Sequence, residues 1–387
     1  MNDVFIAAGG GGDPVGTVIV AAAVSSAATG AGAEATAGAG AGAGFGTGTG
    51  AGAATGAGGG RRPTVLTYAW ERPEVDPTPG PLGNAHFTGL SRNGRRPAVI
   101  TPAARPVPPA GSTLPRLAGD LPAGLLLLDP YEGLPGMAER IRRLACDGPG
   151  DGGGQVRIVD IGGDVLAHGD EETLCSPLVD ALTLAACALA GVDATVYVAG
   201  PGTDGEIPQD VLLDRLGSRC LVPAAGDAAT AATALSWHPS EASALFTAAI
   251  HGVRGTVRTA QHLIPLTDAS ARVHRLGLDE ALRHNAVARR LLESGPRTLD
   301  EAADLAERLT GIHEIARERP GAHARPPARP GSLPSTPEQA LEKLRAKANG
   351  ARHVTYRFAA RALGLTWQQI PALRAVLGTG GAVLTLP

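Results

Sequence analysis

The stretch from Val156 to Asp180 constrains the fold of this chain more than any other segment. A short apolar run, Val156–Val159, predicts a buried strand that ends at Asp160. A polar loop with glycines and acids follows, and Ser176-Pro177 then opens an apolar segment with residue types that begin helices. The order of strand, acidic glycine loop and capped helix predicts a site in an α/β fold.

Strands and helices alternate along most of the chain. This predicts an α/β fold, a mostly parallel, Rossmann-like three-layer sandwich with a small C-terminal helical appendage. The expected strands are 3–8, 64–68, 98–101, 125–128, 156–159, 194–198, 220–222, 256–258 and 263–267. The expected helices are 15–24, 136–145, 176–190, 208–216, 237–250, 279–292 and 299–317.

Composition divides the chain into three parts. Residues 1–317 are expected to form the α/β domain, in which a Gly/Ala/Thr tract from 26 to 60 is expected to be a disordered insertion. A linker rich in Pro and Arg spans 318–337, and 338–387 is expected to be a small basic helical tail. The tail has seven Lys or Arg against two acids, whereas the whole chain has a net charge of −3.

Lysine and cysteine usage excludes several kinds of chemistry. The only lysines are Lys343 and Lys347, so the main body lacks the lysine of a Walker-type phosphate loop or of a Schiff base. The cysteine spacings match neither a zinc motif nor CxxC, which favours free thiols in a reducing cytoplasm, although Cys175 in the central loop leaves a thiol nucleophile open. Because no stretch reaches the roughly 20 apolar residues of a membrane helix, we expect a cytoplasmic protein without a membrane partner.

Acids and glycines follow nearly every expected strand. Ligands of parallel sheets bind beyond the carboxyl ends of the strands, so these loops are expected to meet in one cleft. The candidates to line it are Gly9, Gly10, Gly11, Gly12, Asp13, Glu71, Asp129, Gly162 and Gly163. A single acidic loop is usually a solvated turn, but several at one edge indicate a site for a polar ligand.

Asp160 and Asp164 are the first candidates for the chemistry of this cleft, and Glu171 is the third. Carboxylates gathered in a cleft can bind a hard cation, act as general acid and base, or accept hydrogen bonds from sugar hydroxyls or an amine. Asp160 and Asp164 are the candidate metal ligands, and Mg²⁺ is the candidate cofactor. The alternative for Asp160 is structural, with its carboxylate accepting hydrogen bonds from loop N–H groups.

His238 and Glu241 form a second candidate pair in the segment WHPSE. His238 could act as a general base or a metal ligand, with Glu241 one helical turn away. Ordinary helix-start chemistry explains the same residues, because Pro239 suits the first helical position and acids are favoured in the first turn.

Two alternative functions stay open from the residues alone. The N-terminal strand, glycine run and helix are typical of an NAD(P)-dependent oxidoreductase, but Pro14 and Val15 break the strict GxGxxG pattern. Ala360, Gly364 and Ile370 have a helix-turn-helix spacing in the basic tail, which would suit a ligand-responsive DNA-binding regulator. Pro371, inside the expected recognition helix, argues against DNA as a partner.

Several of these segments together resemble an uncharacterised family, domain of unknown function 1152. The resemblance is carried by FIAAGGGGD (5–13), TYAWER with the VDPTPGP loop (67–81), DIGGDVLAHGDE with SPLVD (160–180), WHPSEA (237–242) and LTDAS (266–270). It spans residues 1–317 and is interrupted by the low-complexity tract. Because the family has no established activity, the resemblance implies a shared site without a mechanism.

These observations predict an enzyme of the hydrolase, transferase or lyase class that acts on a polar, nucleoside-like or sugar-like small molecule. Asp160 and Asp164 are expected to bind the cation or the substrate, and Gly9–Gly12 to cradle the ligand. Glu171 or His238, with Glu241 nearby, is expected to move protons. A homo-oligomer is left open.

Overall fold

The computed structural model describes residues 4–36, 62–92, 94, 96–146, 154–318, 331–378 and 380–387. Its centre is an eight-stranded sheet with the strand order β4-β6-β2-β1-β7-β8-β12-β9. The strands are β1 (Val4–Ala7), β2 (Thr64–Thr67), β4 (Ala98–Ile100), β6 (Gly124–Leu127), β7 (Val156–Ile161), β8 (Ala194–Ala199), β9 (Cys220–Leu221) and β12 (Val273–Gly277). The five central strands, from β6 to β8, are parallel, whereas β4 and β12 run antiparallel to them.

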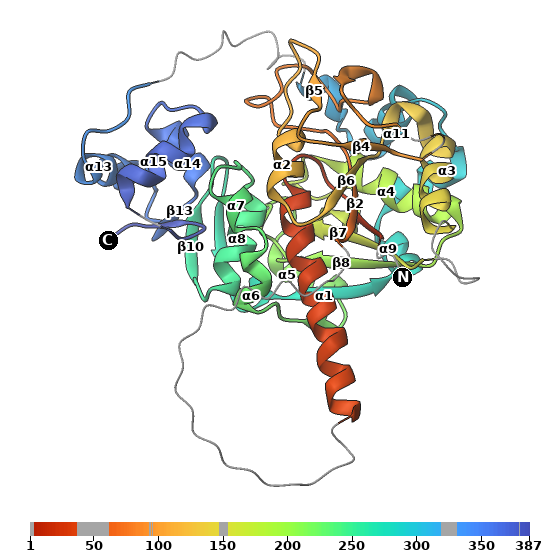
Figure 1. Cartoon of the computed structure of the whole chain (residues 1–387), viewed down its shortest axis with the longest axis horizontal. Coiled ribbons are helices and arrows are strands. Elements are labelled where there is room, and N and C mark those ends of the chain that lie inside the picture. Colours follow the sequence, from red (N-terminus) through yellow and green to blue (C-terminus); the bar gives the residue numbers. More distant parts are fainter. Residues whose placement is uncertain are drawn as a thin grey trace.

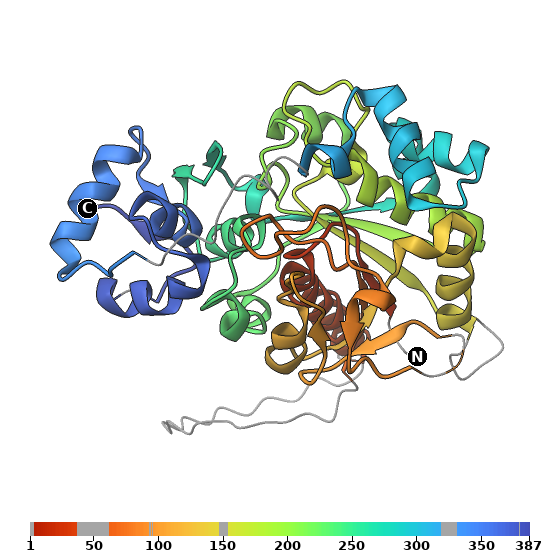
Figure 2. The same ribbon diagram turned by 90° about the horizontal axis from the view of Figure 1, so that it is seen from above.

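Helices cover both faces of this sheet, which confirms the predicted α/β sandwich (Figure 1, Figure 2). One face carries α1 (Asp13–Thr36), α2 (Leu114–Asp120), α6 (Ala225–Ala229), α7 (Ala232–Leu235) and α8 (Glu241–Ile250). The other carries α3 (Gly133–Cys146), α4 (Pro177–Ala190), α5 (Gln209–Arg215), α9 (Leu278–His284), α10 (Ala286–Ser294) and α11 (Leu299–Thr310).

Each central strand contributes to both cores, because successive side chains point to opposite faces of a sheet. Phe5 of β1 packs in the core under α1, and its neighbour Ile6 packs in the core under α4. Parallel strands buried on both faces read as nearly continuous apolar runs, and this is why the sequence predicts them. The sequence pattern misses β12, which carries His274 and Arg275 among its five residues.

Helix α1 continues farther than the sequence predicts. A helix over 15–24 and a disordered tract from residue 26 are expected, but α1 runs to Thr36. Alanine has the highest helix propensity, so this Ala-rich segment extends a helix that already packs on the sheet. Residues 37–60 of the tract lie outside the described residues. Within the described part of the chain, no helix is both long enough and apolar enough to cross a membrane.

Residues 331–387, the C-terminal unit, pack beside the main sheet (Figure 1). Its helices α13 (Pro337–Lys347), α14 (Tyr356–Ala362) and α15 (Ile370–Leu377) share a core of their own. Its strands β13 (His353–Val354) and β14 (Leu384–Thr385) extend the hairpin of β10 (Gly255–Arg258) and β11 (Leu263–Leu266) into a four-stranded sheet. The unit is therefore mainly helical, and it is joined to the main domain by the pairing of β13 with β10. Because α15 begins at Ile370, Pro371 lies in the first turn, where proline is tolerated.

Candidate functional site

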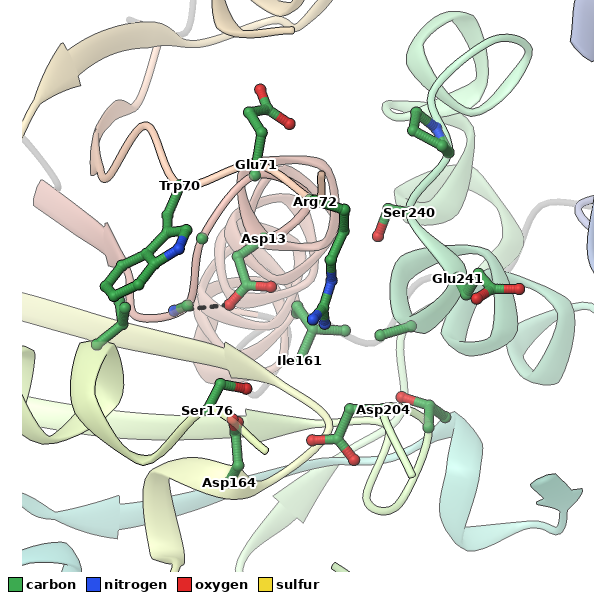
Figure 3. Close-up of a pocket in the computed structure, with 18 of the residues that line it drawn as sticks. Asp13, Trp70, Glu71, Arg72, Ile161, Asp164, Ser176, Asp204, Ser240 and Glu241 are labelled. Carbon is green, nitrogen blue, oxygen red and sulfur yellow. Dashed lines mark hydrogen bonds between the residues drawn. The ribbon is translucent and has the colours of Figure 1, made fainter. Parts of the chain in front are cut away.

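A pocket of about 150 Å³ lies at the carboxyl edge of the parallel strands (Figure 3). Its walls come from the loops after β1, β2, β7 and β8, from the starts of α4 and α8, from the turn between β10 and β11, and from the C-terminal unit. The acids that line it are Asp13, Glu71, Asp160, Asp164, Asp180, Asp204, Glu241, Glu314 and Glu318. The arginines are Arg72 and Arg357, so acidic side chains outnumber basic ones in the lining.

The turn after β7 places Asp160 and Asp164 in this lining. Gly162 and Gly163 adopt φ angles of 134° and 125°, a conformation that residues with a side chain rarely adopt. A Cβ atom on Gly162 would lie 2.1 Å from Oδ2 of Asp204, so glycine is required for the turn to pass this carboxylate. The turn folds back far enough for the Val165 N–H to donate to Asp160 Oδ2 at 3.3 Å. Asp160 therefore accepts a hydrogen bond from a loop N–H group, as the structural alternative predicts, and it also lines the pocket.

Asp180, in the first turn of α4, brings a third carboxylate to this pair. One oxygen each of Asp160, Asp164 and Asp180 lies within 4.8 Å of the others. Asp180 is only 2% exposed, and its Oδ1 has no hydrogen-bond partner among the described residues. A buried oxygen without a donor is costly. Three carboxylates at this separation have the ligand type that a hard divalent cation requires.

Burial and mutual repulsion change the proton affinities of these acids. Burial, the largest cause, and neighbouring carboxylates raise the pKa of Asp160, Asp164 and Asp180 well above its ordinary value. Burial, together with the charge of Glu206, raises the pKa of Asp204 to about 7. At neutral pH these acids therefore favour a bound proton or a bound cation, because either removes the repulsion.

Asp13 begins α1 and projects into the pocket (Figure 3). Its Oδ2 accepts a hydrogen bond from the Gly9 N–H at 2.9 Å. Burial raises the pKa of Asp13 to about 7, although this bond and the charge of Arg72 lower it. A carboxyl group with a pKa near neutrality can both accept and release a proton at pH 7, as a general acid or base must.

Two glutamates hold the start of α4. Glu206 accepts hydrogen bonds from the two N–H groups that precede the helix, at 2.7 and 2.8 Å, and from the Ser176 hydroxyl. Glu314 accepts a hydrogen bond from the Leu178 N–H at 3.1 Å. Ser176 therefore occupies the predicted N-cap position, but its hydroxyl donates to Glu206 rather than accepting from the helix. Burial raises the pKa of Glu314 to about 8.

The glycine run Gly9–Gly12 packs closely against other loops of the chain. A Cβ atom on Gly10 would lie 2.4 Å from the Trp70 carbonyl oxygen, and one on Gly12 would lie 2.3 Å from the Ser240 hydroxyl. All four glycines line the pocket. The close approach that requires glycine at these two positions is therefore between segments of the protein, whereas the sequence predicts an approach by a ligand.

His238 and Glu71 belong to one chain of hydrogen bonds. The Ser240 N–H donates to His238 Nδ1 at 3.1 Å, so the ring proton lies on Nε2, which donates to the Thr113 hydroxyl at 3.0 Å. The Thr113 hydroxyl and N–H each donate to Glu71 Oε1 at 2.6 Å. Burial lowers the pKa of His238 to about 3, so the ring is neutral. Because both ring nitrogens are engaged, this geometry does not favour the predicted general-base role.

Glu241 is bound by the C-terminal unit. Arg357 of α14 pairs with Glu241 at 3.3 Å and also with Glu74. The Thr355 hydroxyl and the Ala260 N–H donate to Oε1 of Glu241, the latter at 2.9 Å. Glu241 therefore joins three segments at the edge of the pocket, and these bonds occupy both of its oxygens.

Four predicted residues lie outside the pocket that the described residues form: Gly162 and Gly163, which shape the turn after β7, and the acids Asp129 and Glu171. Asp129 accepts hydrogen bonds from two backbone N–H groups at 2.7 and 3.0 Å. Glu171 accepts from two N–H groups of its own loop and pairs with Arg215 at 2.6 Å. Burial raises the pKa of Glu171, but these hydrogen bonds lower it below its ordinary value. Both acids follow strands as expected, but their side chains turn back onto nearby loops.

Several residues of the site are absent from the sequence-based candidates. Asp204 follows β8, so the rule that ligands bind at strand ends could have found it. Asp180 lies within the central stretch, in the segment SPLVD, but one turn into the helix. Glu314 lies far from the other acids in the sequence and carries no local signal.

The fold and the pocket define a three-layer α/β protein with an acidic pocket at the carboxyl edge of its parallel strands. The chain belongs to the family described as protein of unknown function (DUF1152), whose model matches residues 38–322. This confirms the resemblance found in the sequence. The match omits β1, the glycine run and the C-terminal unit. No curated protein and no solved structure matches the chain.

Proposed function

We propose that this protein is a divalent-cation-dependent enzyme that acts on a polar small molecule by hydrolysis, group transfer or lysis. Asp160, Asp164 and Asp180 bind the cation, for which Mg²⁺ is the candidate. When bound, the cation supplies positive charge that polarises a substrate oxygen. Asp13 is the candidate group for proton transfer, because it lines the same pocket and its pKa is raised to about 7 by burial.

One observation carries the cation site: the orphaned oxygen of Asp180. Acidic clusters are common without an ion, but Asp180 Oδ1 is buried, lacks a donor among the described residues, and belongs to the group of three carboxylates that lines the pocket. A cation at this position would satisfy that oxygen and remove the repulsion among the three acids.

A nucleoside-like or sugar-like substrate suits the rest of the lining. Carboxylates accept hydrogen bonds from sugar hydroxyls, and Trp70 adds a flat ring at the side of the pocket (Figure 3). The two alternatives are less well supported: Trp70 and Ser240 pack closely against Gly10 and Gly12 of the glycine run, and Arg357 of the C-terminal unit pairs with Glu74 and Glu241 of the main domain.

The cation site is tested by titrating the full chain with Mg²⁺ in a calorimeter. The wild type is expected to bind Mg²⁺. Asp180→Asn is expected to lower the affinity for Mg²⁺ by about tenfold or more, because one charged ligand is lost. Asp214→Asn is the matched control, since Asp214 is exposed on α5, and it should bind as the wild type does. No binding of Mg²⁺ or Mn²⁺ to the wild type would refute the proposal.

Unfolding of the cation-free protein separates lost binding from lost structure. In EDTA at pH 7, Asp180→Asn should be at least as stable as the wild type, because it removes one of three mutually repelling carboxylates. A clear loss of stability would instead make Asp180 a structural residue. A thermal-shift screen with nucleosides, nucleotides and sugar phosphates, with and without Mg²⁺, then identifies the substrate class by mass action.

A further inference from the structure

We infer that the substrate of this pocket carries an oxyanion group, a phosphate or a carboxylate, and that Arg72 binds it. The inference rests on the proposed function, because it names the substrate class of the same pocket. It makes Arg72 the residue that determines specificity for a charged substrate over its neutral parent compound.

The two arginines of the lining differ in what they contact. Arg357 is engaged by Glu74 and Glu241, and its side chain is only 11% exposed. The Arg72 guanidinium, by contrast, makes no hydrogen bond or ion pair with any residue that the structure describes, although Arg72 is exposed and lines a pocket rich in carboxylates. Figure 3 shows its side chain extending into the pocket between Asp13 and Ser240 and ending beside Ile161. Its donors are therefore available to a ligand.

The backbone that carries Arg72 is fixed on both sides. Before it, Glu71 is held by the Thr113 N–H and hydroxyl at 2.6 Å. After it, the Arg72 carbonyl accepts hydrogen bonds from the N–H groups of Val75 and Asp76 at 2.8 and 3.1 Å. Asp76 is in turn bonded to a second loop, through the Gly111 N–H at 3.2 Å. A cation presented from a fixed loop loses little freedom on binding a ligand, which favours affinity.

The chemistry of guanidinium identifies the group it receives. Its planar fork of N–H donors matches the paired oxygens of a carboxylate or a phosphate, with two parallel hydrogen bonds. The remaining lining is acidic, so an anion is repelled by every carboxylate that is ionised and binds best once these charges are neutralised. A divalent cation on Asp160, Asp164 and Asp180 provides this neutralisation. Binding of the cation and of the oxyanion should therefore be cooperative, and each should raise the affinity for the other.

Calorimetric titration with two probe anions tests the inference. Inorganic phosphate and malonate are titrated separately into the full chain, with saturating Mg²⁺ and with EDTA. The wild type should bind at least one of them, more tightly with Mg²⁺, and the preferred probe shows which oxyanion the substrate carries. Arg72→Gln should weaken that binding about tenfold or more. Arg72→Lys should have an intermediate effect, because it keeps the charge and loses the fork.

Arg275→Gln is the matched control, since Arg275 is exposed on β12 and does not line the pocket. Arg72→Gln should bind Mg²⁺ as well as the wild type does, because it removes no carboxylate. If Mg²⁺ binds but neither anion does, or if Arg72→Gln binds anions as the wild type does, the inference is overturned and the cation site stands. If Mg²⁺ fails to bind while anion binding depends on Arg72, the inference stands and the proposed function fails. If neither Mg²⁺ nor an anion binds, both are overturned.

Discussion

Replacing Glu314 by glutamine is expected to stabilise the cation-free protein at alkaline pH and to change its stability little at pH 5. Glu314 is 8% exposed, and the only hydrogen bond that its side chain makes with the described residues is accepted from the Leu178 N–H, which a glutamine oxygen can also accept. Burial and the nearby charges of Glu206 and Glu318 raise the pKa of Glu314 from 4.5 to about 8. The ionised form is therefore disfavoured in the folded protein.

The magnitude follows from the two pKa values. Each tenfold change in proton affinity is worth about 1.4 kcal/mol, so the raised pKa of Glu314 disfavours its ionised form by at most about 5 kcal/mol. Between pH 4.5 and 8 the unfolded chain has released this proton and the folded chain still holds it. The folded state therefore loses stability as the pH rises through this interval. The loss is about 1 kcal/mol at pH 5 and about 4 kcal/mol at pH 8.

Glutamine carries no charge at any pH, so the variant escapes this loss. Urea unfolding of both proteins in EDTA, followed by tryptophan fluorescence from pH 5 to 8.5, measures the difference in the free energy of unfolding. Glu172→Gln is the matched control, because Glu172 is exposed in a loop and should show no such trend. A difference between Glu314→Gln and the wild type that does not grow with pH, or a variant less stable at pH 8, would refute the reasoning.

Two further substitutions test how the pocket is built. Gly162→Ala should lower the free energy of unfolding by about 2 kcal/mol or more, because the residue has a φ of 134° and its new Cβ atom would lie 2.1 Å from Asp204. Gly217→Ala is the control: its Cβ atom would meet nothing within 4 Å, so it should be nearly neutral in the same urea assay. Arg357→Met should destabilise the contact between the C-terminal unit and the main domain by roughly 3 kcal/mol, because it leaves two half-buried carboxylates unpaired. Faster hydrogen exchange in β10 and β13 would report this change, and unchanged exchange would contradict it.

The sequence predicts the fold well because the central strands are buried on both faces. Short apolar runs such as Val4–Ala7 are typical of strands that are buried on both faces, and the helices that connect them are typical of parallel pairing. The rule that ligands bind beyond the carboxyl ends of parallel strands places Asp160 and Asp164 at one edge of the sheet, and the structure has both residues there. Their chemical roles stay predictions. The rule fails for Glu171, because it locates a main-chain position and not the direction of a side chain.

The glycine run illustrates a second limit of sequence reasoning. A glycine-rich loop between a strand and a helix indicates that something approaches the backbone closely, but the sequence cannot identify what approaches. At Gly10 the neighbour is the Trp70 carbonyl, and at Gly12 it is the Ser240 hydroxyl. Both neighbours are distant in sequence, so only the folded chain distinguishes internal packing from ligand binding. Glu314 is hidden from sequence reasoning for the same reason.

The buried acids also connect the stability of the fold to its ligand. Natural domains are stable by only about 5–15 kcal/mol. Glu314 alone would cost about 4 kcal/mol at pH 8, and Asp160, Asp164 and Asp180 have raised pKa values for the same reason of burial. The free protein must therefore hold several of these groups protonated, and a cation that replaces those protons should stabilise the folded state by mass action. Mg²⁺ binding should then release protons and become tighter as the pH rises, because protons and the cation compete for the same oxygens.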